Sequence, residues 1–132
     1  MKTNMLYAVM AATMLSAPVS AQDVSAFDQC KSCHVVTAPD GRNIAGRGRT
    51  GPNLYGIIGQ PAGYQPDYNY SPGTLAARDA GLVWTQANLA EFISNPTAFL
   101  QDFTGDDSVR SRMSYRTQTG QAEVAAFLAS VR

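Results

Sequence analysis

Five consecutive residues contain three of the side chains best suited to bind a cofactor. Cys30, Cys33 and His34 form a C-x-x-C-H sequence, CKSCH, at residues 30–34. This pattern is typical of covalent haem attachment, because two thiols about one helical turn apart can each bond one vinyl group of the same porphyrin. The adjacent imidazole then projects toward the iron at the centre of the ring. The motif therefore predicts thioether bonds from Cys30 and Cys33 and an axial iron ligand in His34.

Other kinds of site could use the same side chains. A structural zinc ion needs four ligands, whereas the chain has one His and two Cys. A thioredoxin-like dithiol normally lies in a βαβ unit, and no alternating strand pattern flanks the motif. A plain disulfide would leave His34 without a role. Haem attachment is therefore the favoured interpretation, and a thiol oxidoreductase that uses Cys30 and Cys33 is kept as a minor alternative.

The second axial position on a haem iron needs another donor or stays open to an external ligand. The chain has no second His, and Met113 is the only Met beyond residue 14. Its neighbours in residues 110–116 (RSRMSYR) are polar, as in a loop that presents one apolar side chain inward. Ligation by His and Met is an electron-transfer arrangement that raises the reduction potential. We therefore expect Met113 to be the second iron ligand.

The first residues have the pattern of a secretory signal peptide. Lys2 is the only charged residue before Asp23, residues 5–15 (MLYAVMAATML) are apolar, and small residues lead to Ala21. The apolar run is too short to span a bilayer, which takes about 20 residues. We expect cleavage after Ala21, export to the periplasm without membrane insertion, and a single mature domain of residues 22–132.

The charge balance excludes a general nucleic-acid binder. Ten Lys and Arg offset ten Asp and Glu, whereas a nucleic-acid binder has a basic excess on one face. Loss of Lys2 with the leader would leave nine positive and ten negative residues, a net charge of −1. Nothing in the sequence indicates an oligomer, so we expect a monomer with no nucleic-acid partner.

Local signals predict short helices. One is expected from about residue 24 into the motif. Ser71 followed by Pro72 is typical of a helix start, and Thr85 can cap another helix that ends before Pro96. Pro96 can itself begin a further turn.

The C-terminal run predicts an amphipathic helix from about residue 120, because Val124, Phe127, Leu128 and Val131 recur at helical spacing. No alternating run predicts a sheet. Residues 35–55 have the composition of a long loop, which a large flat cofactor would explain. The expected fold class is all-α.

These motifs together resemble the class I c-type cytochromes, most closely the bacterial cytochrome c2 branch. The resemblance covers nearly all of residues 22–132 and rests on CKSCH, RTGPNLYG at 49–56, the Trp84 segment, SNP at 94–96 and Met113 before a terminal helix. It implies the cytochrome c fold, with short helices and long loops around one covalently bound haem c. It also implies a soluble one-electron carrier rather than an enzyme. The implied partners are a bc1-type donor complex and a photosynthetic reaction centre or terminal oxidase, which dock at the exposed haem edge.

The resemblance also assigns residues to the haem environment. Pro52 matches a proline whose carbonyl oxygen accepts the N–H of the ligating imidazole. Trp84 and Tyr70 match residues that reach haem propionates, and Tyr68 matches an aromatic residue beside the haem. The apolar pocket would be lined by Leu54, Leu89 and Phe99.

Some positions depart from the family pattern. Asp23 replaces a glycine that packs against the terminal helix, and Gln60 replaces an arginine near the propionates. Phe92 replaces a tyrosine that donates to the ligating sulfur, a hydrogen bond worth about 0.5–1.5 kcal/mol. The segment before Met113 is long, as in the longer bacterial members. The absent hydroxyl at Phe92 makes a peroxidase-like haem enzyme or ligand sensor, with a displaceable sixth ligand, the alternative function.

Arginines could replace the lysines through which this family often docks. Lys31 is the only lysine beyond residue 21, and six arginines flank the proline loop and Met113: Arg42, Arg47, Arg49, Arg110, Arg112 and Arg116. They could equally be ordinary solvated charges. We expect a weakly steered docking face rimmed by arginine, with electron-transfer rates that fall as the salt concentration rises.

Overall fold

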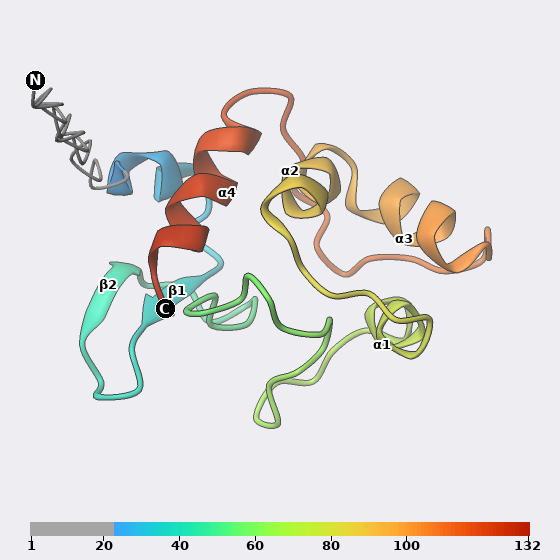
Figure 1. The fold of residues 1–132 in the computed structure, drawn as a ribbon, viewed down its shortest axis with the longest axis horizontal. Coiled ribbons are helices and arrows are strands. Elements are labelled where there is room, and N and C mark those ends of the chain that lie inside the picture. Colours follow the sequence, from blue (N-terminus) through green and yellow to red (C-terminus); the bar gives the residue numbers. More distant parts are fainter. Residues whose placement is uncertain (1–22) are drawn as a thin grey trace, which may run out of the picture.

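The computed structural model describes residues 23–132, so the expected signal peptide, residues 1–21, lies outside the described residues. Short helices joined by long loops dominate the fold, as predicted, and one small sheet accompanies them (Figure 1). The elements in chain order are the 3-10 helix η1 (Val24–Gln29), strands β1 (Val35–Thr37) and β2 (Asn43–Gly46), and helices α1 (Pro72–Asp79), α2 (Gln86–Ser94), α3 (Pro96–Thr104) and α4 (Gln121–Ser130).

The α-helices begin where the capping residues predict. The side-chain oxygens of Ser71 and Thr85 each accept a hydrogen bond from a backbone N–H in the first turn, at 3.2 and 3.1 Å. Asn95 ends α2 and caps α3, whose first residue is Pro96. Such caps satisfy N–H groups that have no partner within the helix. The sequence prediction of these three starts is confirmed.

The prediction that residues 35–55 form a loop without a sheet was wrong in part. Strands β1 and β2 pair antiparallel, with Val36 opposite Ala45, and a tight turn at residues 38–42 joins them. Each strand has three or four residues, which is too short for alternation of polar and apolar residues to be visible. Pairing between the two segments therefore decides this structure, rather than the pattern within either one.

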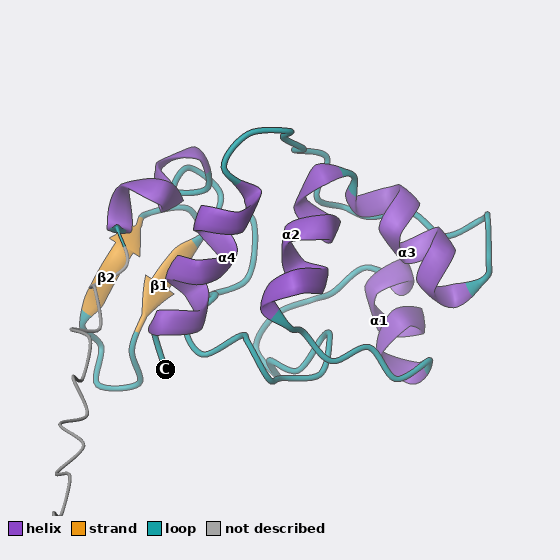
Figure 2. Cartoon of the chain, turned by 45° about the horizontal axis from the view of Figure 1, so that its top comes forward, coloured by secondary structure: helices purple, strands orange, loops and turns teal. Residues whose placement is uncertain are grey.

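The helices surround one apolar core. Helix α2 packs against both α3 and α4, and α4 packs against η1 (Figure 2). Phe27 of η1 meets Phe127 of α4 with 5.7 Å between ring centroids. The exposed Asp23 takes no part in this contact, because its carboxylate accepts a hydrogen bond from Ser25 N and caps η1. Among residues 23–132, no helix has the length and apolar character needed to cross a membrane.

Candidate functional site

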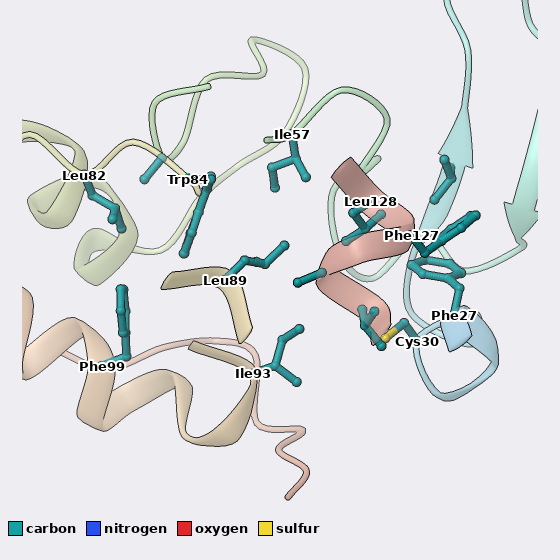
Figure 3. Close-up of a cluster of buried hydrophobic side chains, with 14 of the residues drawn as sticks. Phe27, Cys30, Ile57, Leu82, Trp84, Leu89, Ile93, Phe99, Phe127 and Leu128 are labelled. Carbon is teal, nitrogen blue, oxygen red and sulfur yellow. The ribbon is translucent and has the colours of Figure 1, made fainter. Parts of the chain in front are cut away.

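The CKSCH motif continues the turn that η1 begins. Backbone N–H groups of Cys33 and His34 both donate to the Cys30 carbonyl oxygen, at 3.2 and 3.0 Å. This turn separates the two thiols, so that Cys30 is buried and Cys33 is exposed. Both cysteines are free. Figure 3 shows Cys30 beside Phe27 at the edge of the buried apolar cluster.

The surroundings of Cys30 do not suit a redox dithiol. Burial, followed by the charge of Cys33, raises the pKa of the Cys30 thiol to about 11. A reactive dithiol needs the opposite shift, because the thiolate is the nucleophile. In the described part of the chain, no group of three or more His, Cys, Asp or Glu side chains is placed to hold a metal ion. The geometry therefore favours neither the thiol oxidoreductase nor the zinc site.

His34 is buried and has one ring nitrogen engaged. The side chain is 8% exposed, and its Nδ1 donates to the Pro52 carbonyl oxygen at 2.8 Å. Burial lowers the pKa of the imidazole, and the Pro52 contact opposes this shift only in part. The ring is therefore held neutral, with Nε2 as the free acceptor nitrogen, which is the form that ligates a metal. The Pro52 contact is the one that the resemblance implies, and the roles of both residues beside a haem stay predictions.

A glycine-rich segment, residues 46–51 (GRGRTG), packs closely against the CKSCH motif. Arg47 N and Gly48 N both donate to the Lys31 carbonyl oxygen, at 3.0 and 3.1 Å, and Gly51 N donates to that of Cys33 at 2.8 Å. A Cβ at Gly48 would overlap the Cys33 backbone, and one at Gly51 would overlap the His34 ring. Sequence reasoning missed both glycines as functional residues, although the glycine-rich composition was the available signal.

Asn53 is a third residue that sequence reasoning missed. Its Oδ1 accepts from Thr37 N and Tyr55 N at 3.0 and 3.1 Å, and its Nδ2 donates to the Thr37 carbonyl oxygen at 2.8 Å. The amide therefore ties the segment after Pro52 to the end of β1. This tie fixes the backbone that carries the carbonyl oxygen bonded to His34.

Met113 lies in the long loop between α3 and α4, residues 105–120, and is partly buried. Met113 N donates to Ser111 Oγ at 3.0 Å, and Ser111 N donates to Thr97 Oγ1 of α3 at 3.1 Å. Beyond Met113, Thr117 N donates to the Ile93 carbonyl oxygen of α2 at 3.1 Å. The loop is thus anchored to helices on both sides of Met113. Iron ligation by the Met113 thioether stays a prediction.

The residues expected to line an apolar pocket gather around Trp84. The Trp84 ring contacts Phe92 edge-on at 5.0 Å and stacks on Phe99 at 6.0 Å between centroids. Leu89 is buried in the same cluster (Figure 3). Leu54 is partly buried and packs against this cluster. Phe92 acts here as an aromatic packing residue.

Three further residues that the resemblance places near the haem have hydrogen-bond partners within the chain. Tyr68 OH donates to the Thr50 carbonyl oxygen at 2.7 Å, and Tyr70 OH accepts from Gln65 N at 3.4 Å. Burial raises the pKa of Tyr70. The side chain of Gln60 is exposed, and its carbonyl oxygen accepts from Trp84 N. The expected contacts of Tyr70 and Trp84 with propionates stay predictions.

The donor set fits a haem c. It comprises two free thiols on one turn, a neutral imidazole with a free nitrogen, and one thioether on an anchored loop. Trp84 is 6% exposed. No side-chain nitrogen or oxygen among residues 23–132 is both fully buried and without a hydrogen-bond partner, so the indole N–H of Trp84 is not a buried orphan donor, and its expected bond to a propionate stays a prediction.

Comparisons with known proteins agree with this chemistry. No family model matches the chain. Cytochrome c-551 of Roseobacter denitrificans is 42% identical, covering 98% of this chain and 96% of the relative. Cytochrome c2 of Rhodobacter capsulatus is 38% identical, covering 99% of this chain and 98% of the relative.

Solved structures show the same likeness. Ferric cytochrome c-550 from Paracoccus versutus has a TM-score of 0.78 and 38% identity, covering 81% of this chain and 92% of that chain. Cytochrome c2 from Rhodobacter capsulatus also has a TM-score of 0.78 and 38% identity, covering 80% and 91%. The chain therefore belongs to the class I cytochromes c, in the cytochrome c2 group, and is an electron-transfer protein rather than an enzyme.

Proposed function

We propose that the protein is a periplasmic one-electron carrier with one haem c, attached through Cys30 and Cys33 and ligated by His34 and Met113. Residues 1–21 would serve as the cleaved export signal. Electrons would pass from a bc1-type complex to a reaction centre or a terminal oxidase. Membership of the cytochrome c2 group supports electron transfer between such membrane complexes.

The hydrogen bond between His34 Nδ1 and the Pro52 carbonyl oxygen is the observation that carries this proposal. It orients the ring and leaves Nε2 as the nitrogen that would bind iron. A hydrogen-bonded partner on the second nitrogen is the usual support of a ligating histidine and raises its basicity. The absence of a side chain at Gly51, directly before Pro52, leaves room for this ring, because a Cβ there would overlap it.

The remaining residues would keep water away from the iron and limit rearrangement during transfer. When bound, the haem supplies the ferrous–ferric couple. The aromatic rings of Trp84, Phe92 and Phe99 form an apolar wall, and low solvent access is one determinant of a haem's reduction potential. Transfer of an electron needs no general acid or nucleophile from this chain.

Exposed arginines support docking by weak electrostatic steering. Arg110 Nη1 donates to the Asp107 carbonyl oxygen at 2.7 Å, and Arg112 Nη1 donates to that of Asn69 at 2.8 Å. These bonds hold two cations beside the Met113 segment, and Arg116 is exposed on the same segment. Rates of reduction by a bc1-type complex should fall as NaCl is added. Rates that are independent of salt would contradict the steering.

Replacement of Met113 by leucine tests the proposal directly. The ferric wild-type holoprotein should show the weak long-wavelength sulfur–iron absorption band, and Met113→Leu should abolish it. The midpoint potential should also fall, because the thioether favours ferrous iron. Gln118→Ala is the matched control, since it removes one side-chain hydrogen bond in the same loop, to the Ser94 carbonyl oxygen, and leaves the Met113 thioether and the Ser111 bond to Met113 N in place. An unchanged spectrum and potential in Met113→Leu would refute the proposed ligation.

A further inference from the structure

Gln29 connects the haem-attachment segment to the Met113 loop. Its Oε1 accepts a hydrogen bond from Tyr115 OH at 2.8 Å, and its Nε2 donates to the Thr119 carbonyl oxygen at 3.2 Å. Gln29 is the last residue of η1 and directly precedes Cys30. This side chain therefore bonds two residues of the loop that precedes α4, which lie 86 and 90 positions beyond Gln29 in the sequence.

The two hydrogen bonds of Gln29 end on parts of the chain that are held in different ways. Thr119 directly precedes Gly120, the N-cap of α4, and α4 packs on η1. The Thr119 bond therefore joins two parts of the same packed unit and fixes the Gln29 amide in place. Tyr115 instead lies within residues 112–116, between the anchors at Ser111 and Thr117.

Few hydrogen bonds hold this short segment outside its anchors. Among residues 23–132, its side chains make two, from Arg112 to the Asn69 carbonyl oxygen and from Tyr115 to Gln29. Of these two bonds, the one from Tyr115 ends on Gln29, the residue directly before CKSCH. It must break, together with the Arg112 bond, if segment 112–116 is to open and Met113 is to move away from His34.

We propose that Gln29 is a positioning residue that latches Tyr115, and through it Met113, onto the haem-attachment side of the protein. The inference rests on the proposed ligation by Met113. Local opening of segment 112–116 would let an external ligand compete with the thioether. The latch resists that opening, because the Tyr115 bond is present in the closed form and absent in the open one.

The experiment measures the affinity of the ferric holoprotein for imidazole. Binding is detected as loss of the sulfur–iron absorption band. Tyr115→Phe removes only the hydroxyl, and Gln29→Ala removes the acceptor. Each should raise the imidazole affinity about two- to fivefold, as expected for one neutral hydrogen bond near the surface. The double variant should bind imidazole as Gln29→Ala does, because both changes remove the same contact.

Gln118→Ala is the matched control. Gln118 Nε2 donates to the Ser94 carbonyl oxygen at 3.0 Å, at the anchor rather than in the opening segment. This variant should leave the imidazole affinity unchanged while its thermal unfolding midpoint falls slightly.

The outcomes separate the latch from the ligation that it serves. A wild-type protein with no sulfur–iron band would refute Met113 ligation itself. If the band is present and Tyr115→Phe binds imidazole as the wild type does, the latch is refuted and the ligation stands. A lower melting temperature without a change in imidazole affinity, or additive effects in the double variant, would also refute the latch.

Discussion

The two proposed iron ligands are held in different ways. The histidine side, defined as residues 24–56, is held by backbone hydrogen bonds, by the Asn53 amide and by closely packed glycines around the buried His34. The methionine side, defined as residues 105–120, is held mainly by side-chain hydrogen bonds, at exposed or partly buried positions such as Tyr115 and Ser111. Close packing resists displacement strongly, whereas single exposed hydrogen bonds do not. The methionine side should therefore be the one that opens.

The largest expected effect is at Gly51 on the histidine side. Gly51→Ala places a Cβ against the His34 ring, so the ring or the glycine-rich segment 46–51 must shift. We expect a loss at the upper end of the about 1–3 kcal/mol typical of overpacking, with little haem protein recovered. Haem absorbance per chain and the thermal midpoint measure this.

Gly41→Ala is the control for that change. Gly41 has a φ of 89° and open space around it, so only the backbone cost of about 1–2 kcal/mol applies. This variant should retain normal haem incorporation. If Gly51→Ala behaves like Gly41→Ala, the backbone around His34 can shift to accept a Cβ, and the histidine side is not held by close packing.

The next effect is expected at Asn53, whose side-chain amide makes three hydrogen bonds to the backbone of Thr37 and Tyr55. Asn53→Ala should lower the free energy of unfolding by about 1–3 kcal/mol, because partly buried backbone groups of Thr37 and Tyr55 lose their partners. The thermal midpoint should fall by several degrees, roughly 4–8 °C for each kcal/mol.

Asn43→Ala removes another asparagine amide, this one within the β1–β2 hairpin. Asn43 is exposed and donates to the Gly46 carbonyl oxygen at 3.1 Å. Its loss should cost no more than about 0.5 kcal/mol. Equal losses for the two variants would mean that Asn53 does not organise the histidine side.

The smallest effect is expected at a turn on the methionine side. Hydrogen bonds from the Ser108 hydroxyl and backbone N–H lower the pKa of Asp106 below 3.8. Because the folded pKa is depressed, the stabilising contribution is fully present above pH 3.8 and is lost as the pH falls through the folded value. Ser108→Ala should raise this pKa toward 3.8, as an NMR titration of the ferrous protein would measure.

The carboxyl of Asp23 provides an internal reference for that titration. Its pKa is also lowered, by hydrogen bonds from Ser25 at the start of η1, and Ser108→Ala should leave it unchanged. An Asp106 pKa that does not move would show that the Ser108 hydroxyl contributes nothing to the turn.

Several features of the protein were predictable from short stretches of sequence. The CKSCH spacing, the helix starts at Ser71 and Thr85, and the terminal helix depend on residues within about one or two turns of each other. Local backbone geometry determines these features, without contacts to distant parts of the chain. The resemblance to cytochromes c extended them to Pro52 and Trp84, and the cytochrome family and fold are confirmed.

Other features came only from contacts between distant segments. The β1–β2 pairing, the approach of Gly51 to His34, and the bonds of Gln29 to the Met113 loop join residues that the chain brings together on folding. An isolated glutamine before Cys30, or a glycine before Pro52, carries no signal of its partner. The sequence alone determined which side chains could hold a haem. The tertiary structure decided how firmly each is held, because firmness depends on packing between distant parts of the chain.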